Sequence, residues 1–111
     1  MVLSIRLYLL QRISAVVMAP LVLVHLGVMI YAIQGGLTAD EILGRTRGSL
    51  LWALVYGAFV VAVAVHGAIG LRAIAYEWGK ISDVALDILM WIFGFSILLL
   101  GGRAVYAVIA L

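Results

Sequence analysis

Three long apolar stretches, separated by two short polar segments, account for most of the sequence. They run over about residues 7–33, 49–76 and 84–110. A helix needs about 20 mostly apolar residues to cross the hydrocarbon layer of a bilayer, so each stretch is long enough to span it. The pattern therefore predicts an all-α integral membrane protein with three transmembrane helices in a single domain, residues 1–111.

The two polar segments predict connections on opposite sides of the membrane. QGGLTADEILGRTRG follows the first stretch, and its glycines and charges are typical of a water-facing loop. EWGKISD follows the second stretch and predicts a short turn, in which Ser82 or Asp83 can cap the third helix.

Basic residues near the helix ends predict the orientation, because cytoplasmic loops carry an excess of lysine and arginine. An N-terminus inside the cell places more of these residues on the cytoplasmic side than outside: Arg6, Arg12, Arg72 and Lys80 against Arg45 and Arg47. We therefore expect a multi-pass protein of the cytoplasmic (inner) membrane with its N-terminus inside.

The composition supports the membrane assignment and excludes several functions. Hydrophobic residues make up 68% of the chain and charged residues 11%, whereas soluble domains carry about 45–50% and about 25%. The chain has no cysteine, so it forms no disulfide and supplies no thiolate to a metal or an iron–sulfur cluster. Its seven basic residues are scattered among apolar ones, which excludes a patch that binds nucleic acid.

One histidine, His66, lies deep in the second apolar stretch, in the sequence AVHGAIGLRAIAYEW. Ionisable side chains are costly inside a membrane and often mark functional sites. Small residues lie beside it in the chain and one or two helical turns away: Ala62, Gly67, Ala68, Gly70 and Ala73. A neutral imidazole with open space beside it can bind a metal or a haem iron. In the alternative, His66 hydrogen-bonds to a neighbouring helix and the small residues only allow helices to pack closely.

The other histidine, His25, has bulky neighbours on its own helix face: Leu21, Val22, Val28 and Met29. Across the bilayer the two histidines are expected to lie roughly 10 Å apart, at about 1.5 Å per residue. Two axial imidazole nitrogens flank one iron only about 4 Å apart. A haem with His66 as one axial ligand therefore needs its second ligand from another chain.

Three arginines lie within or near the predicted spans. Arg12 and Arg72 fall on the same side of the membrane as His66, where either can pair with a haem propionate, since arginine is well shaped for a carboxylate. Snorkelling to lipid headgroups is the alternative. Arg103 lies about 12 Å from the C-terminal end of its helix, which is also within reach of the headgroups.

Two motifs resemble those of the membrane-anchor, cytochrome b-type subunits of succinate dehydrogenase and fumarate reductase. QRISA, residues 11–15, is similar to the H-R-x-S-G stretch that opens the first helix of the larger anchor subunit. HGAIGLRAIAYEW, residues 66–78, is similar to the H-x-x-x-G-[IL]-R stretch that ends its second helix, which an acidic–aromatic pair follows. RISAVVMAP, residues 12–20, also looks like the smaller anchor subunit, so the resemblance fits either of the two anchors.

The resemblance implies that His66 is an axial ligand of haem b and that Arg12 and Arg72 interact with the haem propionates. It also implies a quinone site, for ubiquinone or menaquinone, formed by residues near the inner ends of the first two helices: Tyr8, Arg12, Ser14 and Trp78. The sequence departs from the family motifs at several positions: Gln11 replaces a histidine, Tyr8 a serine, and Trp78 a tyrosine or phenylalanine.

The function that the resemblance implies is that of a non-catalytic anchor in a succinate:quinone oxidoreductase. A flavoprotein subunit and an iron–sulfur subunit are expected on the inner face, with a second three-helix anchor beside this chain. Electrons from succinate would pass through the iron–sulfur clusters to quinone near Arg12. In a variant of this function, His25 holds a second haem, with Arg103 as its propionate partner. In the alternative from another class, the chain is a cofactor-free membrane protein, such as a transporter half or an assembly factor, and His66 lies in a helix-packing face.

Overall fold

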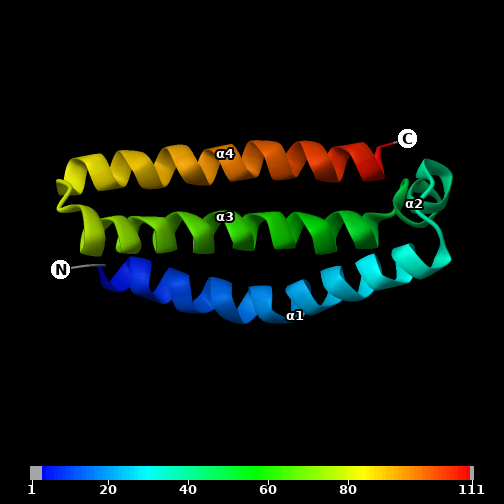
Figure 1. The fold of residues 1–111 in the computed structure, drawn as a ribbon, viewed down its shortest axis with the longest axis horizontal. Helices are drawn as coiled ribbons and strands as arrows, with labels where there is room; N and C mark the ends of the chain where they lie inside the picture. Colours follow the sequence, from blue (N-terminus) through cyan, green and yellow to red (C-terminus); the bar gives the residue numbers. More distant parts are fainter. Residues whose placement is uncertain (1–3, 111) are drawn as a thin grey trace.

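The structure, a computed structural model, describes residues 4–110, and four helices occur in that part of the chain (Figure 1). Three are long, α1 (Ile5–Gly35), α3 (Leu50–Gly79) and α4 (Asp83–Ile109), and α2 (Ala39–Thr46) is short. Each long helix has the length and apolar composition to cross a membrane, and residues 4–110 contain no strand. The predicted all-α fold with three apolar spans is confirmed.

The helix α3 packs against both α1 and α4 (Figure 1). The beginning of α1, the end of α3 and the beginning of α4 lie at one end of the molecule, which we name the Lys80 end after a residue of the α3–α4 turn. The short α2 lies at the opposite end, which we name the α2 end. The path of α1 bends near the middle of its length, where Pro20 removes one backbone hydrogen bond of the helix.

Each of the described helices begins at a serine or threonine whose side chain accepts a hydrogen bond from a backbone N–H of the first turn: Ser4, Thr38, Ser49 and Ser82. Ser82 is thus the N-cap of α4, one of the two residues that the sequence offers for this role. The helix α3 ends at Gly79, and the C-cap residue Lys80 adopts a left-handed backbone conformation with φ of 48°. The chain reverses its direction in the turn at Lys80, so that α4 runs antiparallel to α3 (Figure 1).

The expected loop between the first two spans contains a helix, so that prediction is wrong over Ala39–Thr46. A capping box starts α2, because the Thr38 hydroxyl accepts from the Glu41 N–H while the Glu41 carboxylate accepts from the Thr38 N–H. The end of α2 contacts the end of α4: the Thr46 hydroxyl donates to the Val108 carbonyl at 2.6 Å. α2 therefore satisfies a backbone carbonyl at the end of α4 that has no partner within its own helix.

Small residues let α3 and α4 approach each other closely. A Cβ atom added to Gly94 would lie 3.3 Å from the Ala68 Cβ, and one added to Gly101 would lie 2.6 Å from a methyl group of Val60. Most large apolar side chains of the described residues are exposed, including Leu23 and Trp91. This distribution suits a chain whose outer surface faces lipid or other apolar helices.

We expect Gly101→Ala to destabilise the folded chain by about 1–3 kcal/mol, the usual cost of overpacking. The new Cβ would lie 3.3 Å from the Val60 Cβ as well as 2.6 Å from its methyl group, and a β-branched side chain has little rotamer freedom to move aside. Gly102→Ala is the matched control, because a Cβ there meets nothing within 4 Å. Thermal unfolding in detergent, followed by circular dichroism, checks this. Equal midpoints for the two variants would contradict the close α3–α4 approach.

Candidate functional site

His66 faces α1 through one nitrogen of its ring. Its Nδ1 lies 3.3 Å from the Ser14 hydroxyl oxygen and 3.4 Å from the backbone carbonyl oxygen of Gln11. The Ser14 hydroxyl donates a hydrogen bond to the same carbonyl at 3.0 Å. Ser14 is buried, with 6% of its surface exposed. These three groups form a polar cluster between α1 and α3.

The chemistry of the cluster favours one of the two neutral tautomers of His66. A carbonyl oxygen only accepts hydrogen bonds, so the contact of Nδ1 with the Gln11 carbonyl is a hydrogen bond in the tautomer that carries its proton on Nδ1. The Ser14 hydroxyl gives its own hydrogen to the Gln11 carbonyl, and its oxygen is therefore free to accept from Nδ1 as well. In that tautomer the lone pair lies on Nε2, which is the form of imidazole that binds a metal. Within residues 4–110, both hydrogen bonds of the His66 ring use Nδ1.

The small residues around His66 are used for helix packing. A Cβ added to Gly67 would lie 3.3 Å from the Phe93 ring of α4, and one added to Gly70 would lie 3.4 Å from the Gln11 side-chain nitrogen of α1. Ala68 is buried against α4. These small residues therefore pack against the neighbouring helices, which is the alternative role that the sequence suggests for them. The position of Nε2 is set by the His66 ring and by its hydrogen-bond partners on α1.

Gln11 is a residue of this cluster that sequence reasoning treats only as a departure from the family motif. Its backbone carbonyl accepts from Nδ1 of His66, and its side-chain oxygen is buried with no hydrogen-bond partner among the described residues. The signal in the sequence is the spacing: Gln11 and Ser14 lie three residues apart and therefore on the same face of α1, so one side chain of α3 can contact both.

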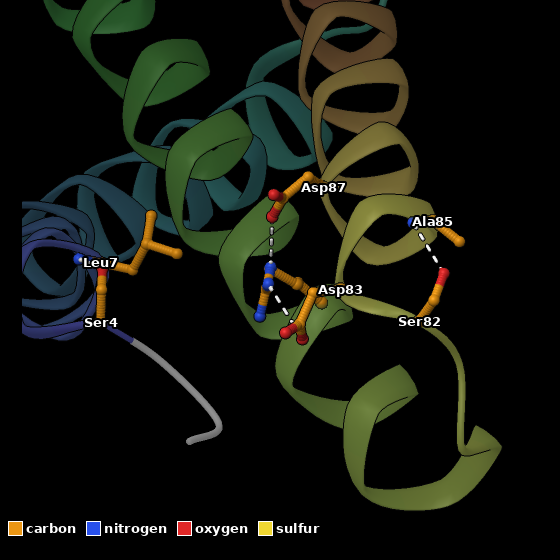
Figure 2. A network of polar contacts seen from close by, with 7 residues as sticks. Ser4, Leu7, Ser82, Asp83, Ala85 and Asp87 are labelled. Carbon is orange, nitrogen blue, oxygen red and sulfur yellow. Dashed lines mark hydrogen bonds and ion pairs between the residues drawn. The ribbon is translucent and has the colours of Figure 1, made fainter.

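Arg72 is buried and paired within the chain. Its Nε donates to the Asp87 carboxylate at 2.9 Å, and a terminal nitrogen lies 3.9 Å from the Asp83 carboxylate. Figure 2 shows these two acidic side chains pointing from the first turns of α4 toward α3. The predicted propionate role of Arg72 would therefore have to compete with two carboxylates of the same chain, a pairing that sequence reasoning missed.

Tyr8 and Arg12 lie together on the exposed side of α1. The Arg12 guanidinium is 5.9 Å from the centre of the Tyr8 ring, and Tyr8 is 51% exposed. Trp78, near the end of α3, is 85% exposed at the same end of the molecule. The fourth predicted quinone residue, Ser14, is buried against α3, where its hydroxyl contacts His66. The structure thus brings two of the four predicted quinone residues together.

His25 lines a hollow of about 470 Å³ at the α2 end. Its ring centre lies 5.2 Å from that of Phe59 and 6.3 Å from that of Tyr56, both on α3. Val28 and Met29, bulky neighbours of His25 on its own helix, line this hollow, and Gly101 and Ala104 are the small residues of α4 that border it. Arg103 is exposed and is not part of the lining, whereas Arg45 at the end of α2 is. Arg45 is therefore the arginine at the hollow beside His25.

The two histidines lie too far apart to bind one iron. His66 is level with Ser14 on α1, and His25 lies 11 positions further along that helix. His25 is level with Phe59 on α3, and His66 lies 7 positions further along that helix. At about 1.5 Å per residue these offsets correspond to roughly 16 Å and 10 Å. Both offsets exceed the spacing of about 4 Å between two axial imidazole nitrogens, so we expect the two histidines of one chain not to share an iron.

The described residues define a multi-pass α-helical membrane protein that holds one imidazole against a buried serine between two of its spans. A family model described as the succinate dehydrogenase/fumarate reductase transmembrane subunit matches residues 2–102. The chain therefore belongs to this family, and it is a membrane subunit of a succinate dehydrogenase or fumarate reductase complex that contains other subunits. No curated protein and no solved structure matches the chain.

Proposed function

We propose that the chain anchors a succinate:quinone oxidoreductase in the membrane, binds haem b through Nε2 of His66, and contributes Arg12 to a quinone site. The observation that carries the haem assignment is the contact of Nδ1 with a backbone carbonyl, which leaves the lone pair on Nε2. Metal-binding histidines usually donate their other ring N–H to a carbonyl or carboxylate in this way. The family to which the chain belongs supports the same assignment.

The donor set of the chain fits a haem better than a bare metal ion. Among residues 4–110, no group of three or more His, Asp or Glu side chains lies together to hold a metal. A haem needs only an axial ligand from the chain, because the porphyrin supplies its other ligands. When bound, the haem would accept and release single electrons between the iron–sulfur clusters and the quinone. The second axial ligand would come from the second anchor subunit, since His25 is too distant.

In this proposal Tyr8 and Arg12 bind the quinone head group. The guanidinium of Arg12 and the hydroxyl of Tyr8 can both donate hydrogen bonds to a quinone carbonyl oxygen, and the positive charge favours the negative charge that develops there on reduction. The indole N–H of Trp78, exposed at the same end of the molecule, is a further donor. Ser14 belongs instead to the ring environment of His66.

The Lys80 end would be the cytoplasmic side in this proposal. Arg6, Arg12, Arg72 and Lys80 all lie toward this end, as the excess of basic residues inside predicts. The flavoprotein and iron–sulfur subunits would bind here, close to Tyr8 and Arg12. We assign the propionate contact to Arg12, because Arg72 already has two carboxylate partners. In a two-haem variant, the hollow beside His25 would hold the second haem, and Arg45 would replace Arg103 as the nearby cation.

The spectrum of the purified complex tests the proposal. We expect the chain to co-purify with a flavoprotein, an iron–sulfur protein and a second anchor, and to show a b-type band in the reduced-minus-oxidised difference spectrum. Haem counted per flavin distinguishes one haem from two. The rival function, a cofactor-free membrane protein, is favoured by the packing role of Gly67, Ala68 and Gly70. A featureless spectrum in a preparation without those partners would support this rival.

A further inference from the structure

We infer that Ser14 and the backbone carbonyl of Gln11 are positioning groups for His66: they hold the ring in the Nδ1–H tautomer and direct Nε2 toward the haem. This inference rests on the proposed haem function and deepens it. In this inference Ser14 orients the haem ligand His66, whereas the family resemblance implies that Ser14 binds a quinone.

The hydrogen-bond geometry gives Ser14 a defined orientation. Its hydroxyl donates to the Gln11 carbonyl one turn earlier in α1, at 3.0 Å. This bond to its own helix fixes the hydroxyl rotor, as is common for serine inside helices. The remaining lone pairs of the oxygen then face Nδ1 of His66 at 3.3 Å. Both acceptors of the Nδ1 proton therefore come from one turn of α1.

The burial of Ser14 makes the arrangement specific. Only 6% of its surface is exposed, so water does not readily replace its hydroxyl. The carbonyl of Gln11 is the longer contact, at 3.4 Å from Nδ1. Removal of the hydroxyl would leave the Nδ1 proton with this one long bond, and the ring would be free to rotate about its side-chain bonds.

The hydrogen bond should also affect the electronic properties of a bound iron. An oxygen that accepts from Nδ1–H increases the basicity of the ligating nitrogen. A more basic axial ligand stabilises the oxidised iron and lowers its reduction potential. Loss of the Ser14 hydroxyl should therefore raise the midpoint potential of the haem. A purely structural role, in which Ser14 only joins α1 to α3, predicts no such change.

The test compares variants of Ser14 in the intact complex, with the haem midpoint potential and haem retention as readouts. We expect Ser14→Ala to raise the potential and to weaken haem binding by about 10-fold, a cost typical of losing an outer hydrogen bond to a metal ligand. Ser14→Thr should restore both, because it keeps the hydroxyl. Ser14→Val, which has the shape of threonine without the hydroxyl, should reproduce the alanine result. The Thr and Val pair therefore decides the question even where Ser14→Ala fails to assemble.

Ser96→Ala is the matched control. The Ser96 hydroxyl also donates to a carbonyl of its own helix, that of Ile92 at 2.7 Å, but Ser96 is exposed on α4. We expect this variant to keep the wild-type potential. Equal potentials and equal haem content for Ser14→Thr and Ser14→Val would overturn the positioning role and leave the haem at His66 intact. A wild-type complex without haem would overturn the proposed function itself, and the positioning role with it.

Discussion

His66→Ala is expected to remove the b-type absorbance band from the assembled complex. The substitution deletes the Nε2 donor, and no other described histidine lies within reach of the same iron, since His25 is at least about 10 Å away along the helices. Loss of an outer partner of a metal ligand costs about 10–100-fold in affinity, and loss of the ligand itself should exceed about 100-fold. Haem content per flavin, measured together with the difference spectrum, checks the result.

His25→Ala is the matched histidine variant for this experiment. It removes an imidazole of the same size from the other half of the bundle, and its haem content should equal that of the wild type. The reverse outcome, a band that survives His66→Ala and disappears in His25→Ala, would move the haem to the hollow at the α2 end. Partial loss in both variants would indicate two haems, one at each histidine.

The long spans could be predicted from the sequence because hydropathy alone determines them. A stretch of apolar residues longer than the bilayer is thick has few alternatives to a membrane helix. The short helix α2 could not be recognised from composition, because its glycines and charges are equally typical of a loop. The capping box formed by Thr38 and Glu41 is nevertheless a local signal in the sequence for a helix start.

The environments of the two histidines were harder to predict, because a sequence shows only the neighbours on the same helix. His66 has small residues on its own helix, but residues of α1 and α4 fill the space beside Gly67 and Gly70. His25 has bulky neighbours on its own helix, yet it borders a hollow that Gly101 and Ala104 of α4 help to line. The space around a side chain in a helical bundle therefore depends on which faces of the other helices meet it.

The sequence also does not show which carboxylates the arginines pair with. The sequence places Arg12 and Arg72 on the same side of the membrane, and the family resemblance gives both of them to haem propionates. The structure distinguishes them, because Asp83 and Asp87 lie one turn apart at the start of α4 and both face Arg72. The guanidinium of Arg12 packs instead over the Tyr8 ring, on the exposed side of α1. This difference makes Arg12 a better candidate than Arg72 for contact with either a haem propionate or a quinone.

Arg12→Gln should lower the rate of quinone reduction by the complex about 100-fold, within the range of about 10²–10³ that is typical when one preorganised donor to a developing negative charge is lost. Glutamine keeps a hydrogen-bond donor but removes the positive charge. Arg12→Lys should fall between the glutamine variant and the wild type, because it keeps the charge and loses the planar fork of donors. Succinate oxidation coupled to a soluble artificial electron acceptor should be unchanged, since that reaction takes place in the partner subunits. The ratio of the two activities is therefore the measurement.

Arg6→Gln is the charge-matched control, on the same helix and toward the same end of the molecule but six residues from Arg12. Its quinone reduction should stay within a factor of about two of the wild type, because an exposed charge more than a turn away contributes little through water and headgroups. If both variants lowered the rate equally, the effect would come from the overall positive charge of the Lys80 end, and Arg12 would have no specific contact with quinone. If Arg12→Gln changed only the haem potential and left quinone reduction intact, Arg12 would be a propionate partner alone.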